Sequence, residues 1–218
     1  MKLAELRGES IDVYGPAEDS ALLASVAADL VDPSDYVLDV GTGSGYIAAK
    51  VIDTVGATVV GSDINPHACR RARSRDLSVV RADLTAAFRT GVFDVVLFNP
   101  PYLPNLVTDI TTGDDSAGEP TMVSTTGGES IVADDIDQDP DWLERAVTGG
   151  ETGRAVIEPF LDDVGRVLTA DGYVLILVSS VTGVEAVVEY AGQRGFHTVA
   201  CRDVTYPGET LTVLKLVR

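Results

Sequence analysis

Four consecutive residues, Asn99-Pro100-Pro101-Tyr102, have the types and spacing of a site that binds a planar amino group. The two prolines fix their own φ angles, and Pro100 restricts the residue before it, so Asn99 is held extended with its carboxamide aimed by the backbone. The ring of Tyr102 offers a surface on which a flat group can stack. The tetrapeptide therefore predicts a loop that receives a planar, nitrogen-bearing substrate.

The segment before this loop predicts its position in the fold. Residues Phe93 to Phe98 are almost all apolar, which is typical of a strand buried on both faces of a parallel sheet. The tetrapeptide then begins at the carboxyl end of a central strand. Ligands of open α/β sheets bind at that edge.

A glycine-rich turn predicts a cofactor site at the same edge. An apolar strand, Tyr36 to Val40, leads into Gly41, Gly43 and Gly45, and a helix with apolar spacing follows. Glycines without side chains let backbone amides approach a ligand. The spacing G-x-G-x-G favours a methyl-donor site over the pyrophosphate site of an NAD-dependent oxidoreductase, so that alternative is disfavoured.

Acidic residues follow the next two predicted strands. Asp63 ends the strand Thr58 to Asp63, about twenty residues after the glycines, where a carboxylate accepts hydrogen bonds from ribose hydroxyls. Asp83 and Leu84 follow the strand Ser78 to Ala82. The Asp83 carboxylate is placed to accept from an adenine amino group, and Leu84 to lie against the ring.

The remaining pattern predicts an α/β fold with a mostly parallel sheet. A fifth strand spans Gly172 to Val178. The helix that precedes this strand contains Pro159, so it must begin near Glu158 or be kinked. No helix separates the last two strands, 197–201 and 209–216, so an antiparallel pair around Tyr206-Pro207-Gly208 is expected.

Length and charge set the wider context. We expect a single domain over residues 1–218, with an acidic insertion at about 104–141 that is either solvated or a lid over the substrate. The net charge of -18, with only three lysines (Lys2, Lys50 and Lys215), suggests a halophilic source and disfavours a nucleic-acid partner. No apolar run is long enough to cross a bilayer, so a cytoplasmic protein is expected. No metal-ligand cluster stands out.

Taken together, the sequence resembles the class I, Rossmann-like S-adenosylmethionine-dependent methyltransferases, and within them the HemK/PrmC glutamine methyltransferases of release factors. The archaeal and eukaryotic branch is the most similar. The resemblance covers nearly the whole chain apart from the insertion, and it rests on seven ordered motifs: Tyr14-x-Pro16-Ala17-Glu18-Asp19-Ser20, Asp39-Val40-Gly41-Thr42-Gly43-Ser44-Gly45, Asp63-Ile64-Asn65-Pro66, Asp83-Leu84, Phe98-Asn99-Pro100-Pro101-Tyr102, Gly149-Gly150-x-x-Gly153-Arg154 and Gly208-Glu209-Thr210-Leu211-x-Val213-Leu214-Lys215.

The resemblance implies a seven-stranded sheet whose last strand is antiparallel, with S-adenosylmethionine as the donor. It implies that Asn99 and the Pro100 carbonyl hold the substrate, and that these two and Tyr102 are catalytic. The substrate it implies is the glutamine of the Gly-Gly-Gln motif of a class-1 release factor. It also implies a small zinc-binding activator protein, which would pair with the edge strand 78–82. The residues it places near the donor are Ser20, Asp39, Gly41, Asp63, Asp83, Leu84 and Asn99.

Three alternatives stay open at this stage. The Asn-Pro-Pro-Tyr loop also suits an adenine or guanine N-methyltransferase that acts on DNA or RNA, since flipped bases present a planar amino group. Some relatives methylate protein lysine. A scaffold that binds donor and partner without turnover is the alternative outside enzymes.

Overall fold

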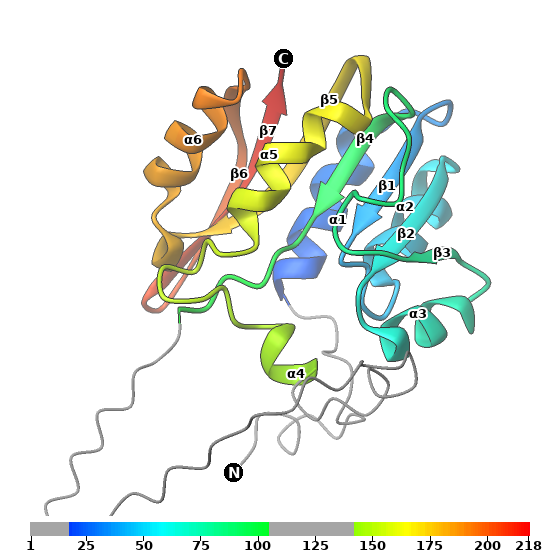
Figure 1. The fold of residues 1–218 in the computed structure, drawn as a ribbon, viewed down its shortest axis with the longest axis horizontal. Coiled ribbons are helices and arrows are strands. Elements are labelled where there is room, and N and C mark those ends of the chain that lie inside the picture. The colour runs from blue at the N-terminus through cyan, green and yellow to red at the C-terminus, as the bar shows by residue number, and fades with distance from the viewer. Residues whose placement is uncertain (1–17, 105–141) are drawn as a thin grey trace, which may run out of the picture.

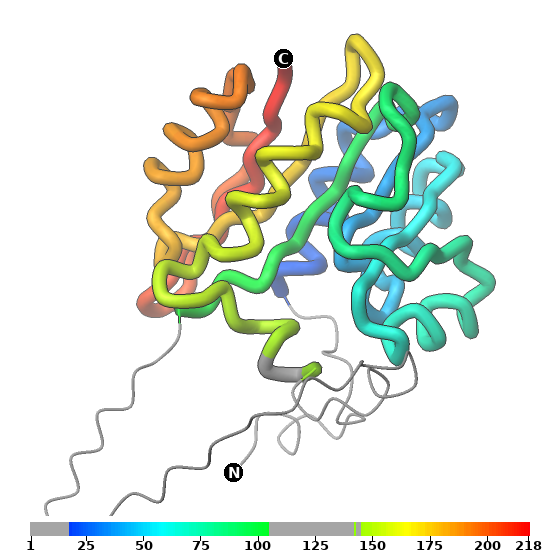
Figure 2. Tube along the Cα trace, in the orientation of Figure 1, coloured from blue at the N-terminus to red at the C-terminus, as the bar shows by residue number. Residues whose placement is uncertain are grey.

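The structure is a computed structural model, and it describes residues 18–104 and 142–218 (Figures 1 and 2). Its described residues form one seven-stranded sheet in the order β3-β2-β1-β4-β5-β7-β6. Neighbouring strands are parallel except where β7 pairs with β5 and with β6. The strands are β1 (Tyr36–Val40), β2 (Thr58–Asp63), β3 (Ser78–Arg81), β4 (Phe93–Phe98), β5 (Leu168–Ser179), β6 (His197–Tyr206) and β7 (Glu209–Val217).

Helices cover both faces of the sheet (Figure 1). Alternate residues of each central strand point to opposite faces, so Val37 and Leu97 pack with α1 and α2, whereas Leu38 and Phe98 pack with α5 and α6. Both clusters consist of buried apolar side chains packed on the central strands, which makes the sheet a rigid platform for loops at its edge. The helices are α1 (Glu18–Leu30), α2 (Tyr46–Val55), α3 (Pro66–Arg73), α4 (Trp142–Arg145), α5 (Ile157–Val167) and α6 (Val184–Gln193), with a short 3-10 turn at Ser180–Thr182.

Local sequence signals explain where several elements begin and end. Asn65 caps α3 by accepting a hydrogen bond from the His67 amide, with Pro66 in the first helical position. Pro159 lies in the first turn of α5, where its missing amide hydrogen has no intrahelical role. The expectation that this helix begins near Glu158 is therefore confirmed.

The predicted fold class is confirmed, including the antiparallel last strand. The β6–β7 pair turns at Pro207-Gly208, as expected, and Gly208 has a φ of +84°. Strands β5 and β6 are longer than predicted because their pairing with β4 and β7 continues past the apolar runs. The predicted acidic insertion and the motif residues from Tyr14 to Ala17 lie outside the described residues. In the described chain, no helix has the length and apolar character needed to span a membrane.

Candidate active site

A cavity of about 370 Å³ lies at the carboxyl ends of β1, β2 and β4, within the size range of small-molecule sites, roughly 300 to 1,000 Å³. Figure 2 shows the chain after β4 running beside the segment that leaves α4, so two distant parts of the sequence meet at this edge. Of the predicted site residues, the cavity brings together ten: Ser20, Gly41, Gly43, Asp63, Asp83, Leu84, Asn99, Pro100, Pro101 and Tyr102.

The turn after β1 forms one wall of the cavity. Gly41 and Gly43 have φ angles of +63° and +54°, a left-handed conformation that glycine adopts at low cost. The Thr42 amide donates to the Ser62 carbonyl at 2.9 Å, and the Gly43 amide donates to the Asp63 carboxylate at 2.8 Å. These bonds fix the turn to β2 and leave its backbone close to the cavity.

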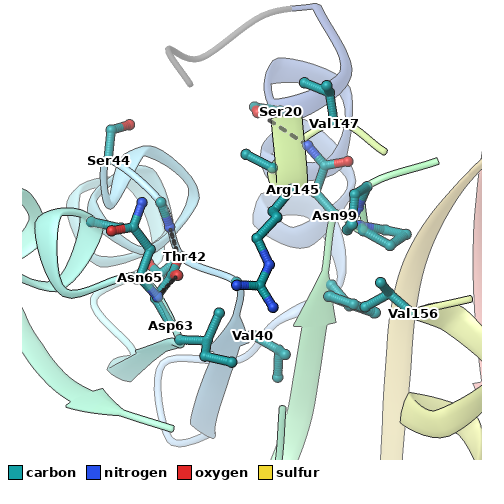
Figure 3. Close-up of a pocket in the computed structure, with 18 of the residues that line it drawn as sticks. Ser20, Val40, Thr42, Ser44, Asp63, Asn65, Asn99, Arg145, Val147 and Val156 are labelled. Atoms are coloured by element: carbon teal, nitrogen blue, oxygen red, sulfur yellow. Dashed lines mark hydrogen bonds between the residues drawn. The ribbon is translucent and has the colours of Figure 1, made fainter. Parts of the chain in front are cut away.

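Asp63 is held by backbone amides on both carboxylate oxygens. Gly43 donates to Oδ2 and Asn65 to Oδ1, each at 2.8 Å. Burial raises the pKa of Asp63, and these backbone hydrogen bonds oppose the rise. Each oxygen retains a further lone pair, so the carboxylate can still accept from hydroxyl groups in the cavity. Figure 3 shows Asp63 across the cavity from Asn99.

Two predicted donor-site residues do not line the cavity. Asp39 lies behind the turn, 1% exposed, where its Oδ2 accepts from the Thr42 hydroxyl at 2.7 Å and its buried Oδ1 has no partner. Burial raises the pKa of Asp39 to about 7. Gly45 caps α2, and a Cβ there would lie 2.3 Å from the Leu77 side chain. In this structure Gly45 allows close packing of α2 against the segment before β3.

Asp83 and Leu84, just after β3, also line the cavity. Leu84 has a φ of +47°, which costs a non-glycine residue on the order of 1–3 kcal/mol. Its side chain also packs against the α5 and α6 core cluster. The surrounding structure therefore holds this residue in a conformation that the sequence did not predict.

Asn99 presents an acceptor with no partner. Its Nδ2 donates to the Ser20 hydroxyl at 3.2 Å, and Ser20 is buried in the first turn of α1. This bond orients the carboxamide, whose Oδ1 is buried and accepts no hydrogen bond. A buried acceptor without a donor is costly, so an unpaired oxygen at the cavity points to a ligand that supplies the donor.

The loop after Asn99 is fixed from behind by the second half of the chain. The Leu103 amide donates to the Val147 carbonyl at 3.0 Å, and the Gly149 amide donates to the Leu103 carbonyl at 2.8 Å. Gly153 approaches so closely that a Cβ would lie 2.5 Å from the Tyr102 carbonyl oxygen. The glycines of the Gly149-to-Arg154 motif thus support the tetrapeptide loop from outside the cavity.

Helix α4 contributes residues that sequence reasoning missed. The Arg145 guanidinium lies 5.3 Å from the centre of the Trp142 ring, and Figure 3 shows Arg145 reaching between Asp63 and Asn99. Trp142 is the chain's only tryptophan, and its place directly after the insertion was the available signal. Other lining residues that were not predicted are Asp19, Val40, Thr42, Ser44, Tyr46, Ile47, Ile64, Asn65, Ala68, Ala82, Phe98, Leu103, Ala146, Val147 and Val156.

Comparison with known proteins identifies the family. Residues 37–109 match the model of a methyltransferase domain. The chain is 32% identical to a Methanocaldococcus jannaschii protein named for N5-glutamine methyltransferase activity, over 95% of this chain and 92% of that protein. The chain belongs to the protein N5-glutamine methyltransferases.

This glutamine methyltransferase has further relatives of similar length. It is 28% identical to the human methyltransferase HEMK2, over 97% of this chain and 92% of that protein. It also resembles the solved structure of the E. cuniculi Mtq2–Trm112 complex, which is responsible for methylation of the eRF1 translation termination factor. That match has 26% identity and a TM-score of 0.68, and covers 95% of this chain and 99% of the other.

S-adenosylmethionine is the methyl donor of this methyltransferase. The residues present fit that molecule by their chemistry. The glycine turn brings backbone close to the cavity, Asp63 offers acceptors for hydroxyl groups, and Leu84 offers an apolar surface.

Proposed function

We propose that this methyltransferase modifies the side-chain amide of the glutamine in the Gly-Gly-Gln motif of a class-1 translation release factor. The relative Mtq2, which acts with Trm112 in methylation of eRF1, supports this substrate. The observation that carries the proposal is the buried, unpaired Oδ1 of Asn99 at the cavity.

A primary amide has two N–H groups, and the loop offers two acceptors for them. Asn99 Oδ1 accepts one, and the carbonyl of Pro100 accepts the other. Tyr102 lines the same cavity and stacks on the planar amide. The Pro100 carbonyl belongs to a backbone that the prolines and the Leu103 and Gly149 hydrogen bonds hold in place, and the Asn99 side chain is oriented by its bond to Ser20, so both acceptors need little reorganisation.

An amide nitrogen is a poor nucleophile, and these two hydrogen bonds make it more reactive. The nitrogen lone pair of an amide is delocalised into its carbonyl, and accepting both N–H groups shifts electron density back toward nitrogen. The same contacts orient the nitrogen, and orientation lowers a barrier by several kcal/mol. No strong base is required first, because the proton is far more acidic once nitrogen is cationic.

The donor binds in this proposal on the side of the cavity that Asp63 and the glycine turn form, across from Asn99. Asp63 accepts from the ribose hydroxyls, Asp83 from the adenine amino group, and Leu84 lies against the ring. Ser20 and the backbone of Gly41 and Gly43 lie near the rest of the donor molecule. Gly45 and Asp39 do not touch the donor and support the glycine turn from behind. When bound, S-adenosylmethionine supplies an electrophilic methyl group on a sulfonium.

Mass spectrometry of a methylation reaction tests the substrate. The full chain is incubated with donor and one of three acceptors: a release factor, its Gln→Lys variant at the Gly-Gly-Gln motif, or duplex DNA and tRNA. We expect a gain of one methyl group on the glutamine peptide only. Equal or greater transfer to lysine or to nucleic acid would overturn the proposal, and donor binding without any transfer would indicate a scaffold.

A small zinc-binding activator is the partner we propose, by analogy with the Trm112 that accompanies Mtq2. In the described chain β3 is an outer strand, and Val80 on it is 37% exposed. Exposed sheet edges accept a further strand from a partner. Arg73, Arg75 and Arg81 are exposed around this edge of an otherwise acidic chain, which favours an acidic partner strand.

We also propose that residues 1–218 form one domain and that the enzyme acts in the cytoplasm, where its proposed substrate works in translation. A single sheet spanning both described ranges supports the first part.

A further inference from the structure

The loop between β3 and β4 has two sides with different surroundings. On one side Asp83 and Leu84 line the cavity. On the other side the residues that follow, from Thr85 to Val92, lie against the last turns of α5. Contacts between this loop and α5 are therefore in a position to affect the conformation of Asp83 and Leu84 at the cavity.

Three side chains make most of the contacts on the α5 side, and we refer to Thr85, Asp163 and Arg166 as the α5 clamp. The Thr85 hydroxyl donates to Asp163 Oδ2 at 2.6 Å, and Thr85 is fully buried. Arg166 donates to the Thr85 carbonyl at 3.1 Å and to the Phe88 carbonyl at 2.6 Å. It also donates to both oxygens of Asp163, at 2.8 and 2.6 Å.

The backbone continues the same attachment. The Gly91 amide donates to the Arg166 carbonyl at 3.0 Å, and the Val92 amide donates to the Val167 carbonyl at 2.8 Å. The whole loop after Leu84 is thus bound to the final turn of α5.

We propose that the α5 clamp consists of positioning residues for the methyl donor, which hold Asp83 and Leu84 in the arrangement that the adenine ring requires. This inference rests on the proposed assignment of that wall to the donor. The clamp begins one residue after Leu84, whose φ of +47° needs support from its neighbours. Arg166 supplies it by donating four hydrogen bonds at once, to two carbonyls and to both oxygens of a carboxylate, whereas an ammonium has only three N–H donors.

A role in surface stability explains the clamp less well. The Asp163 and Arg166 side chains are 42% and 34% exposed, and ion pairs at that exposure contribute little to stability. The Arg166 guanidinium lowers the pKa of Asp163, so the carboxylate stays charged and the clamp stays formed at neutral pH. The clamp differs from an ordinary surface ion pair because it binds Thr85, the residue that directly follows Asp83 and Leu84 at the cavity.

The chain provides a matched control one residue away. Asp162 also lies on α5 and accepts from Arg194 at 2.8 Å and from the Tyr190 hydroxyl at 3.1 Å. The Asp162–Arg194 ion pair joins α5 to the end of α6, and neither residue lines the cavity. Asp162→Asn therefore removes the same charge from the same helix without touching the donor loop.

Calorimetric titration of the full chain with S-adenosylhomocysteine tests the proposal. We expect Asp163→Asn and Arg166→Lys to weaken binding about tenfold, and Asp162→Asn to leave it unchanged. Thr85→Val keeps the buried volume, loses only the hydroxyl, and should weaken binding in the same direction. In methylation assays the KM for S-adenosylmethionine should rise by the same factor, with kcat and the KM for the protein acceptor unchanged.

Equal affinities in the Asp163→Asn and Asp162→Asn variants, with similar melting temperatures, would overturn the positioning role. A fall in kcat with unchanged donor affinity would do the same. These binding results do not depend on the acceptor. A wild-type chain that binds S-adenosylhomocysteine but methylates no release factor would defeat the proposed substrate and leave the clamp to be judged on the titrations.

Discussion

The two ends of the cavity are built in different ways. Apart from Ser20, the end assigned to the donor comes from one stretch of chain, Asp39 to Leu84, and its key carboxylate is fixed by neighbouring backbone amides. The end assigned to the substrate joins separate segments, because Asn99 bonds to Ser20 and its loop is supported by residues from Val147 to Gly153. Recognition of the ribose through Asp63 is therefore a local property of the sequence, whereas the Asp83–Leu84 part of the donor end and the whole substrate end depend on long-range contacts.

Asn99→Ala should separate the two ends most strongly. It removes the unpaired acceptor and the Ser20 contact but leaves Asp63 and the glycine turn in place. We expect kcat to fall on the order of 10³-fold, since losing one preorganised polar group at a reacting centre has that size of effect. Affinity for S-adenosylhomocysteine should stay within a few-fold by calorimetry. Turnover like that of the wild type would refute the substrate role.

Asp63→Ala should produce the opposite pattern. The change removes a charged acceptor from the cavity and leaves the Gly43 and Asn65 amides without their partner. We expect donor affinity to fall by about 10- to 100-fold, because hydrogen bonds to charged groups contribute about 1.5–3 kcal/mol. Asp53→Asn, on the exposed side of α2, controls for the loss of charge. A dissociation constant unchanged in the titration would contradict the ribose assignment.

Most residues that the sequence assigned to the donor lie together at the cavity, because the signals that marked them are short. The strand, the glycine turn and the terminal Asp63 lie within about one βαβ unit, where spacing and residue type determine the geometry. It could not separate residues that line the cavity from those that support it. Gly45 and Asp39 belong to the same motif as Gly41 and Gly43, but they face Leu77 and Thr42.

The substrate end shows why the remainder was harder to predict. Trp142 and Arg145 reach the cavity only because the chain returns to the sheet edge after the insertion, and no local pattern reports that return. At the donor end, Leu84 has a left-handed conformation, and the residue after it bonds to α5, about 80 residues further along the chain. Such features depend on tertiary contacts rather than on propensity.

Gly153→Ala tests whether the substrate end depends on its distant support. Gly153 has a φ of +73°, and a Cβ would lie 2.5 Å from the Tyr102 carbonyl oxygen and from the Thr182 side chain. We expect a loss of about 1–3 kcal/mol of unfolding free energy and reduced turnover, with donor affinity preserved. Gly192→Ala, in α6 with open space around it, should be neutral or slightly stabilising. The comparison needs urea denaturation and methylation assays, and similar results for both variants would show that the motif does not support the loop.

A pH-dependent effect on stability is expected at Asp39, whose carboxyl supports the donor end from behind. Its pKa is raised from the ordinary 3.8 to about 7, so between these values the folded chain keeps a proton that the unfolded chain releases. The contribution of this bound proton to the free energy of unfolding is therefore fully present below about pH 4 and is lost as pH rises through 7. Asp63, whose pKa is raised in the same direction, remains in both proteins, so the difference between wild type and Asp39→Asn isolates Asp39. Urea midpoints between about pH 5 and pH 8 should decline more steeply for the wild type than for the variant, and parallel slopes would show that Asp39 is already ionised in the folded chain.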